Sequence, residues 1–288
     1  MPDSLQVVDL PALKAYAALK IDRRQEMLEL YIKQMEEHGA TVAGRENLCA
    51  LSKRYWRKCI AGVFTGRLYG PRLSLQGLTR EARAAACSSF AKDLDMDNAY
   101  FALLQLLDDG TLINLYKLHA QTFRTAISLY YDVPVADAKI ILLKALFGFA
   151  LRVPGREAYG VLPFIQVLAK ECVSAKVRLA SSRPSLVNFF KEGGRRDPEA
   201  SAFAYVLMDA EHAVLSKLMD SLSQHNLRLV APIFDGAIVC NADFGGGSMP
   251  LRSVTDAIET SHQIIVREKE WPKQEGRGVK RVKREIGE

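Results

Sequence analysis

The stretch that decides the fold of this chain is AKDLDMDNAY, residues 91–100, where three aspartates fall within five residues. Apolar and acidic side chains alternate along it. Residues 90–96 are therefore predicted to form a strand with Asp93 and Asp95 on one face and Leu94 and Met96 on the other. A helix is expected to follow over residues 98–107. Taken alone, the acidic run fits a helix start as well as it fits a metal site.

A second acidic position lies 140 residues after Asp95, in PIFDGAIV, residues 232–239. Asp235-Gly236 between two apolar runs is a hairpin signal, because Gly tolerates positive φ. A plain turn would explain the dipeptide, but flanking strands would also hold the Asp235 carboxylate at a rigid tip. Asp95 and Asp235, presented from distant parts of the chain, can meet at the edge of one small sheet. There they can hold a pair of Mg²⁺ ions, which suits in-line phosphoryl chemistry.

The composition is that of an ordinary globular protein. The 288 residues, 49% hydrophobic and 25% charged, suffice for one large domain or two lobes. No apolar run is long enough to span a membrane, and no signal segment is recognised, so no membrane partner is expected. Five cysteines without a CxxC pair favour an intracellular, reducing compartment, nuclear or cytoplasmic. The net charge of +6 favours a polyanionic partner, although much of it lies in residues 277–284, where a solvated end is the simpler explanation.

Helical periodicity dominates the rest of the sequence. Helices are expected over residues 10–38, 46–60, 112–130, 135–150, 157–180, 199–224 and 253–268, strands over 228–234 and 237–240, and a loop over 245–247. The predicted fold class is α+β, mostly helix around a small antiparallel sheet.

One of the predicted helices carries cations next to apolar side chains. Lys139, Leu143 and Phe147 fall at four-residue spacing, so they share one face of the helix over residues 135–150. A cation and an aromatic on one face can meet a triphosphate and a base. The alternative is a surface lysine beside a core stripe.

A basic, turn-rich segment over residues 65–83 precedes the acidic strand. It contains Arg67, Arg72, Arg80 and Arg83, whose side chains can reach phosphates. The alternative is a polar loop.

In this order the segments resemble family A DNA polymerases, and especially their transposon- and virus-borne relatives, which share a palm fold with the single-subunit phage RNA polymerases. The resemblance covers roughly residues 60–245. It rests on Thr65-Gly66-Arg67-Leu68, Ser74-Leu75-Gln76, Arg80 and Arg83; on residues 95–104; and on Lys139, Phe147 and Gly148. It implies a right-hand polymerase with a palm (residues 61–110 and 200–268), helical fingers (111–199), a reduced, helical thumb-like region (1–60) and a basic, disordered tail (269–288).

The resemblance also implies roles for individual residues. Asp95 and Asp235 would hold two Mg²⁺ ions, or Mn²⁺, with the backbone carbonyl of Met96. Lys139 would be catalytic and bind the incoming triphosphate, and Phe147 would pack on the nascent base pair. Tyr100 stands where the family places its ribose-excluding side chain. The implied nucleotide-binding set is Tyr100, Lys139, Leu143, Phe147 and Gly148, and the implied nucleic-acid-binding set is Arg67, Gln76, Arg80 and Arg83.

The chain departs from the family pattern in two motifs. Bacterial members carry an arginine four residues before the helix lysine, where this chain has Val135, so Lys144, Arg124 or Arg152 is the candidate to supply the missing charge. Their last motif is His-Asp-Glu, of which only Asp235 is kept here. The short thumb implies low processivity or a missing partner, such as a helicase or a primase.

The function implied is template-directed nucleotidyl transfer, in which a DNA polymerase extends a primer–template with dNTPs. A first alternative is a decayed polymerase that persists as a nucleic-acid-binding module, which the missing arginine and the short thumb favour. A second is a dehalogenase-like phosphatase with Asp93 or Asp95 as nucleophile, which the interrupting Lys92 disfavours. The sequence leaves the choice of DNA or RNA template and the oligomeric state open.

Overall fold

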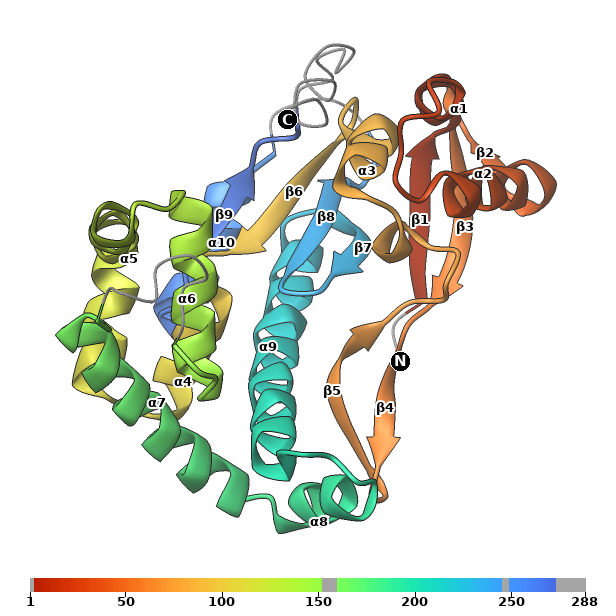
Figure 1. The fold of residues 1–288 in the computed structure, drawn as a ribbon. Helices are drawn as coiled ribbons and strands as arrows, with labels where there is room; N and C mark the ends of the chain where they lie inside the picture. The colour runs from red at the N-terminus through yellow and green to blue at the C-terminus, as the bar shows by residue number, and fades with distance from the viewer. Residues whose placement is uncertain (1–2, 152–159, 245–248, 273–288) are drawn as a thin grey trace, which may run out of the picture.

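A four-stranded antiparallel sheet lies at the centre of the computed structural model, which describes residues 3–151, 160–244 and 249–272. Its strand order is β7-β8-β6-β9, with β6 (Ala91–Met96), β7 (Leu227–Ile233), β8 (Gly236–Asn241) and β9 (Val266–Lys269). Figure 1 shows the sheet between the helices of the middle of the chain on one side and the N-terminal elements on the other. The α+β class predicted from the sequence is confirmed.

The sheet is buried on both faces, which its side-chain alternation explains. Leu94 and Met96 of β6 and Val239 of β8 belong to the large core formed with the helices. Ile238 and Cys240, which alternate with Val239, belong to the core formed with the N-terminal elements. Successive side chains of a strand point to opposite faces, so one strand contributes to both cores. As predicted, Leu94 and Met96 share a face.

The described residues between β6 and β7 form six helices. They are α4 (Ala99–Leu107), α5 (Thr111–Tyr131), α6 (Val135–Phe147), α7 (Pro163–Ser181), α8 (Pro184–Glu192) and α9 (Pro198–Gln224). In Figure 1, α9 runs from α8 and the hairpin of β4 (Trp56–Ile60) and β5 (Val63–Tyr69) up to the sheet. The helix expected over residues 157–180 begins at Pro163, and residues 157–159 lie outside the described ranges. Helix α8 was not predicted.

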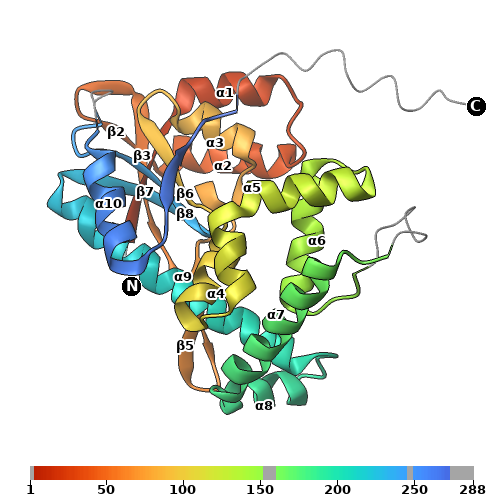
Figure 2. The same ribbon diagram turned by 90° about the vertical axis from the view of Figure 1, so that its left-hand side faces the viewer.

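The N-terminal region mixes strands and helices. It contains β1 (Asp3–Asp9), α1 (Leu10–Ala18), α2 (Gln25–His38), β2 (Ala40–Val42), β3 (Arg45–Arg54) and the hairpin of β4 (Trp56–Ile60) and β5 (Val63–Tyr69). The single helix expected over residues 10–38 is two helices, with Lys20 at φ 50° in the break between them. Figure 2 shows α1, α2 and α3 (Arg80–Cys87) gathered on one side of the molecule.

The helix predicted over residues 46–60 is wrong, because these residues form most of β3 and all of β4. Strand β3 pairs with β1 on one side and with β2 on the other, in the order β1-β3-β2. These pairings join distant residues, such as Val7 with Ala50, and they override the helix-favouring local composition. The region over residues 1–60, expected to be helical and thumb-like, contains strands β1 to β4 as well as helices α1 and α2. The division into palm, fingers and thumb stays a prediction.

The helix predicted over residues 253–268 is wrong in its last part. Helix α10 (Leu251–His262) ends at Gln263, which adopts φ 52°, and Val266–Lys269 then forms β9 on the edge of the sheet. Pairing with β6 explains the switch, because it gives the edge strand its backbone hydrogen bonds. The expected loop over residues 245–247 and the basic residues 277–284 lie outside the described ranges.

Two further properties of the chain concern membrane-spanning helices and the state of its cysteines. No helix within the described ranges is long and apolar enough to cross a membrane. All five cysteines are free, and four of them are buried.

Candidate active site

The two predicted aspartates meet at one end of the central sheet. Asp95 is the last residue but one of β6 and pairs with Gly236, the first residue of β8, so Asp235 in the β7–β8 turn lies directly beside it. The backbone N–H of Met96 donates a hydrogen bond to the carbonyl oxygen of Asp235, 3.1 Å away. Antiparallel pairing thus brings together two carboxylates that are 140 residues apart in sequence.

Gly236 makes this approach possible, for a reason other than the one expected. The positive φ of the turn belongs to Phe234, at 49°, and not to the glycine. A Cβ atom on Gly236 would stand 2.2 Å from the carbonyl oxygen of Leu94 and 3.3 Å from the Cα atom of Asp95. Glycine is therefore required because β6 and β8 approach each other closely at the site.

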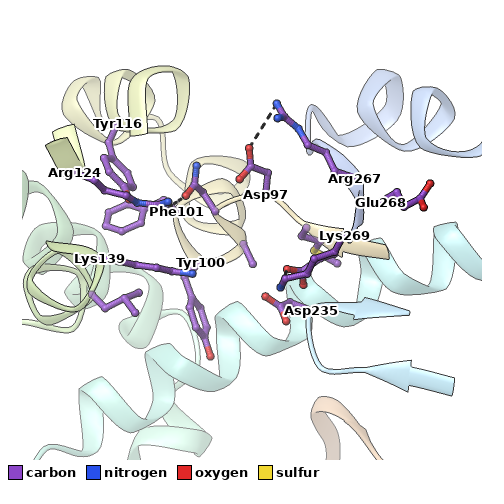
Figure 3. Close-up of a pocket in the computed structure, with 15 residues that line it drawn as sticks. Asp97, Tyr100, Phe101, Tyr116, Arg124, Lys139, Asp235, Arg267, Glu268 and Lys269 are labelled. Atoms are coloured by element: carbon purple, nitrogen blue, oxygen red, sulfur yellow. Dashed lines mark hydrogen bonds and ion pairs between the residues drawn. The ribbon is translucent and has the colours of Figure 1, made fainter. Parts of the chain in front are cut away.

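Both carboxylates open into a cleft with a volume of about 420 Å³ (Figure 3). Its walls come from the end of β6, the start of α4, α5, α6, the β7–β8 turn and β9. The lining residues are Asp95, Met96, Asp97, Asn98, Ala99, Tyr100, Phe101, Tyr116, Arg124, Lys139, Leu143, Asp235, Arg267, Glu268 and Lys269.

The electrostatics of the pair indicate that the two carboxylates are close. Burial raises the pKa of Asp235, and the negative charge of Asp95 raises it further, while Arg67 and Lys269 act in the opposite direction. The Lys269 ammonium group forms an ion pair with the Asp95 carboxylate. A second cation, whether a lysine or a metal ion, is what two such neighbouring carboxylates need to stay ionised together.

The donor atoms fit Mg²⁺. No cluster of three or more His, Cys, Asp or Glu side chains suited to a metal occurs in the described part of the chain. Mg²⁺ bound at phosphoryl-transfer sites nevertheless needs only one or two carboxylates, since waters and substrate phosphates complete its shell. Asp95, Asp235 and the backbone of Met96 supply hard oxygen atoms on one side of an open cleft, and this arrangement suits a phosphate-bridged ion.

Helix α6 supplies the opposite wall. Lys139 and Leu143 line the cleft, as their shared face predicts. Phe147, one turn further, packs edge-on against Tyr100 with ring centroids 5.6 Å apart. Gly148 ends α6 in a left-handed conformation, φ 74°, which identifies a helix-capping role for it. The predicted nucleotide contacts of these residues stay predictions.

A network of hydrogen bonds links Tyr100 on α4 to Arg67 on β5 and Glu211 on α9. The Arg67 guanidinium donates hydrogen bonds to Tyr100 Oη, 3.0 Å away, and to Glu211 Oε2, 2.9 Å away. It also lies over the Phe234 ring, 5.2 Å from the centroid. Burial raises the pKa of Glu211 to about 7 against the opposing charge of Arg67, and the charge of Asp235 adds to the rise. Glu211 thus fixes Arg67, and Arg67 fixes the hydroxyl group of Tyr100.

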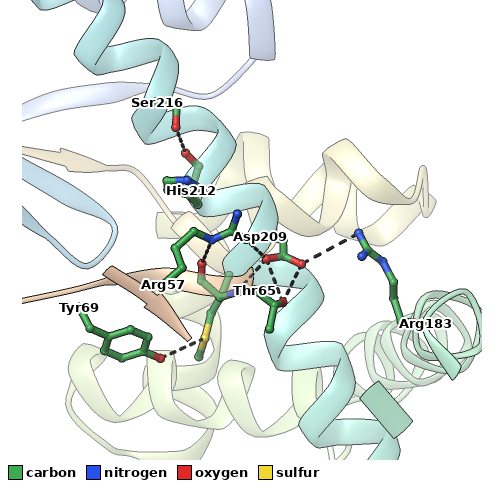
Figure 4. Close-up of polar contacts among 9 residues, drawn as sticks. Arg57, Thr65, Tyr69, Arg183, Asp209, His212 and Ser216 are labelled. Carbon is green, nitrogen blue, oxygen red and sulfur yellow. Dashed lines mark hydrogen bonds and ion pairs between the residues drawn. The ribbon is translucent and has the colours of Figure 1, made fainter. Parts of the chain in front are cut away.

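The strand that carries Arg67 is held on α9 by one carboxylate, shown in Figure 4. Asp209 accepts hydrogen bonds from Thr65 Oγ1 at 3.0 Å and from the backbone N–H of Gly66 at 2.8 Å, and it pairs with Arg57. Arg183 of the α7–α8 connection approaches the same carboxylate at 4.0 Å. Asp209 therefore sets where β5, and with it Arg67, lies relative to α9.

The other predicted nucleic-acid-binding residues have internal partners. Gln76 is buried and bonds to the backbone of Gly70 and Leu68. Arg80 donates to the carbonyl oxygen of Glu270, and Arg83 donates to that of Leu78. These contacts brace the segment that leads to β6, and direct contact of the three side chains with nucleic acid stays a prediction.

Several cleft residues were not identified from the sequence. Arg267 and Lys269 come from β9, where Arg267 lies 3.7 Å from the Asp97 carboxylate. Burial alternates along this strand, with Ile264 and Val266 buried, but the apolar run over residues 264–266 does not show that alternation in the sequence. Glu211 left no local signal, because its partner Arg67 is 144 residues away.

Comparison with known proteins supports a polymerase fold. No protein-family model matches the chain, and no curated protein matches it in sequence. The fold is similar to the POL domain of Pol1 from M. smegmatis, solved in complex with DNA primer-template and dNTP, with a TM-score of 0.53, 12% identity and 91% of this chain covered. The chain spans about half of that structure, 55% of its length. Similarity at this identity shows a shared fold, and the transposon- and virus-borne branch stays a prediction.

Proposed function

We propose that this protein catalyses template-directed nucleotidyl transfer, extending a DNA primer with dNTPs. The observation that carries the proposal is the meeting of Asp95 and Asp235 at one sheet edge, opposite Lys139 across an open cleft. The similarity in fold to a DNA polymerase domain supports it. Acidic side chains facing cationic ones across a cleft suit a reaction in which phosphates must be held and their developing charge neutralised.

The reacting groups would be held from two sides. Asp95, Asp235 and the carbonyl of Met96 would hold Mg²⁺, or Mn²⁺, which when bound activates the primer 3′-hydroxyl and stabilises the departing pyrophosphate. Lys139 would bind the triphosphate and offset the charge that develops on it. The chain's own contribution is mainly to position these groups, because phosphoryl transfer needs little covalent help from the protein.

The aromatic side of the cleft would select the nucleotide. Phe147 and Leu143 would pack against the nascent base pair, and Tyr100 would exclude a ribose 2′-hydroxyl by steric conflict. The bond from Arg67 to Tyr100 Oη supports this role, because it limits the positions that the ring can take. Arg67 itself would contact the primer–template minor groove near the growing end.

The nucleic acid would be held chiefly by its backbone. Template choice rests on base pairing, so the protein needs no sequence-specific contacts. Affinity for a primer–template is then expected to fall steeply with salt. A helicase or primase partner would compensate for a short thumb, and it remains a further proposal.

The test is primer extension by the wild-type protein and by Asp95→Ala and Asp235→Ala. Template-dependent incorporation of dNTPs by the wild type, lost in both variants while duplex binding is retained, is the expected result. A Lys33→Ala variant, which alters an exposed ion pair on α2, is the matched control and should extend normally. Extension that survives in either aspartate variant would contradict the proposal, and release of phosphate from simple esters would favour the phosphatase alternative.

A further inference from the structure

A second cavity lies in the N-terminal region, apart from the cleft. It has a volume of about 470 Å³ and is enclosed by the start of α1, the end of α2, β2 and the first half of β3. It shares no lining residue with the candidate active site. The proposed reaction therefore makes no use of this N-terminal cavity, and its occupant has to be inferred from its own chemistry.

The floor of the N-terminal cavity is apolar and closely packed. The side chains of Met35 and Leu48 line it and are buried. The Cys49 thiol donates a hydrogen bond to the carbonyl oxygen of Met35 at 3.3 Å, which ties β3 to the end of α2. A Cβ atom on Gly39 would stand 2.2 Å from Cys49 Sγ, so α2 and β3 approach each other as closely as a glycine allows. The floor is thus fixed by contacts within the chain, and the cavity is preformed.

The rim of the cavity is acidic, although the net charge of the chain is +6. Glu36 and Glu46 line it together with one cation, Lys14. Lys14 forms an ion pair with Glu36 at 2.8 Å, and among the described residues Glu46 has no such pair. Helix α2, which forms one wall, carries four glutamates and one lysine. An aliphatic segment with cations beside it therefore suits both the floor and the rim.

The sequence contains such a segment near its end. Residues 279–286 read VKRVKREI, in which three aliphatic side chains stand among four cations. We call these residues the tail segment. They lie outside the described ranges, and the described chain ends at Pro272, seven residues before Val279.

The end of the described chain lies close to the cavity. Trp271 Nε1 donates a hydrogen bond to the carbonyl oxygen of Ala91 at 3.0 Å. Two residues before Ala91, the Ser89 hydroxyl donates to the Asp9 carboxylate at 3.1 Å, and the same oxygen accepts a bond of 2.9 Å from Asn47, which lines the cavity. These contacts limit the distance from Trp271 Nε1 to Asn47 Nδ2 to about 21 Å or less.

The length of the intervening chain is sufficient to cover this distance. Figure 1 shows the end of β9 at the same end of the molecule as α1 and α3. Eight extended residues, such as 272–279, span up to about 26 Å. The tail segment can therefore reach the rim of the cavity without any rearrangement of the described elements.

We propose that the tail segment docks in the N-terminal cavity of its own chain. Its aliphatic side chains cover the floor formed by Met35 and Leu48, and its cations lie at the acidic rim beside Glu46. Docking neutralises part of the basic excess of the chain at a place away from the cleft. The inference does not depend on the proposed function, because it uses none of the groups of the candidate active site.

Photo-crosslinking in the intact chain tests the inference. An amino acid with a benzophenone side chain replaces Val282, the protein is irradiated, and the crosslinked peptides are identified by mass spectrometry. Crosslinks from position 282 to the residues around Met35 and Leu48 are the expected result. An equimolar mixture of isotopically heavy and light chains, irradiated together, shows whether each crosslink forms within one chain or between two.

A charge reversal at the rim supplies the matched comparison. Glu46→Lys should lower the crosslinked fraction about two- to fivefold, the range expected for one exposed charge pair. Glu26→Lys is the control, because it makes the same change of charge at an exposed residue in the first turn of α2, away from the cavity. It should leave the crosslinked fraction unchanged.

Three results would overturn the inference. The first is the absence of crosslinks from position 282 to the cavity, which would leave the tail segment in solvent or on another surface. The second is a cavity crosslink that forms only between heavy and light chains, because the occupant would then be a second copy. The third is an equal loss of crosslinking in Glu26→Lys and Glu46→Lys, which would reduce the effect to the overall charge of the chain.

Discussion

Removing the carboxylate of Asp209 on α9 should destabilise the protein far more than removing an exposed acidic side chain would. Its side chain is 17% exposed and accepts hydrogen bonds from Thr65 Oγ1 and the Gly66 backbone, and it pairs with Arg57. Asp209→Ala leaves the Gly66 N–H without its acceptor and the Arg57 guanidinium without its counter-charge. Each of these two uncompensated polar groups costs about 1–3 kcal/mol, so the free energy of unfolding should fall by about 2–6 kcal/mol.

Urea denaturation followed by circular dichroism gives the free energy of unfolding directly. Asp256→Ala is the matched control, because it removes an exposed i,i+4 ion pair with Arg252 and should cost less than about 0.5 kcal/mol. Thr65→Val removes one donor only and should fall between the two. An Asp209→Ala variant within about 1 kcal/mol of the wild type would refute the view that this carboxylate holds β5 on α9.

Three further predictions concern the site. Tyr100→Ala should raise ribonucleotide use at least about tenfold relative to dNTP use, and an unchanged ratio in competition assays would remove the gate assignment. Burial raises the pKa of Glu211 to about 7, so the folded state binds its proton more tightly than the unfolded state, and wild-type stability should fall as pH rises from about 5 to 8. The expected fall in the free energy of unfolding between pH 5 and pH 8 is of the order of 3 kcal/mol. Glu211→Gln should remove most of this fall when both proteins are denatured with urea at the two pH values, and an equal fall in the variant would be evidence against the role of Glu211. Lys269→Met removes the ammonium group from Asp95 and should tighten Mg²⁺ binding about two- to fivefold in calorimetric titrations, whereas weaker binding would show that Lys269 supports the ion.

The parts of the fold that sequence predicts well are those specified by short-range patterns. Alternation around Asp95 predicts β6, and apolar runs on either side of Asp235-Gly236 predict the β7–β8 hairpin. Four-residue spacing predicts that Lys139 and Leu143 share a face, and both line the cleft. In each case the residues that decide the structure are neighbours, so the signal lies within one window of sequence.

The missed parts depend on long-range contacts. Residues 46–60 form strands because β1 and β2 pair with β3, and Val266–Lys269 forms a strand because β6 offers a free edge. The local amino-acid composition of these segments does not indicate that such pairing partners exist. Lys269 consequently reaches Asp95 from a segment predicted as the end of a helix.

Single residues show the same limit. Glu211 sits in the middle of a long helix and reads as an ordinary acidic side chain until Arg67, 144 residues away, is placed beside it. Gly236 was expected to supply a positive φ, and the structure instead requires it for the close approach of β8 to Leu94. The sequence thus predicts the importance of Gly236, but the physical reason for it depends on how β6 and β8 pack together.

The most direct measurement is the number of divalent ions bound in a complex with primer–template and a non-hydrolysable dNTP. Mn²⁺ can be counted by electron paramagnetic resonance, in the wild type and in Asp95→Asn and Asp235→Asn. If the two carboxylates hold a pair of metals together, the wild type should bind about two ions and each variant should lose at least one of them. An unchanged count in both variants, or a wild type that binds none, would contradict the shared metal site on which the proposed activity depends.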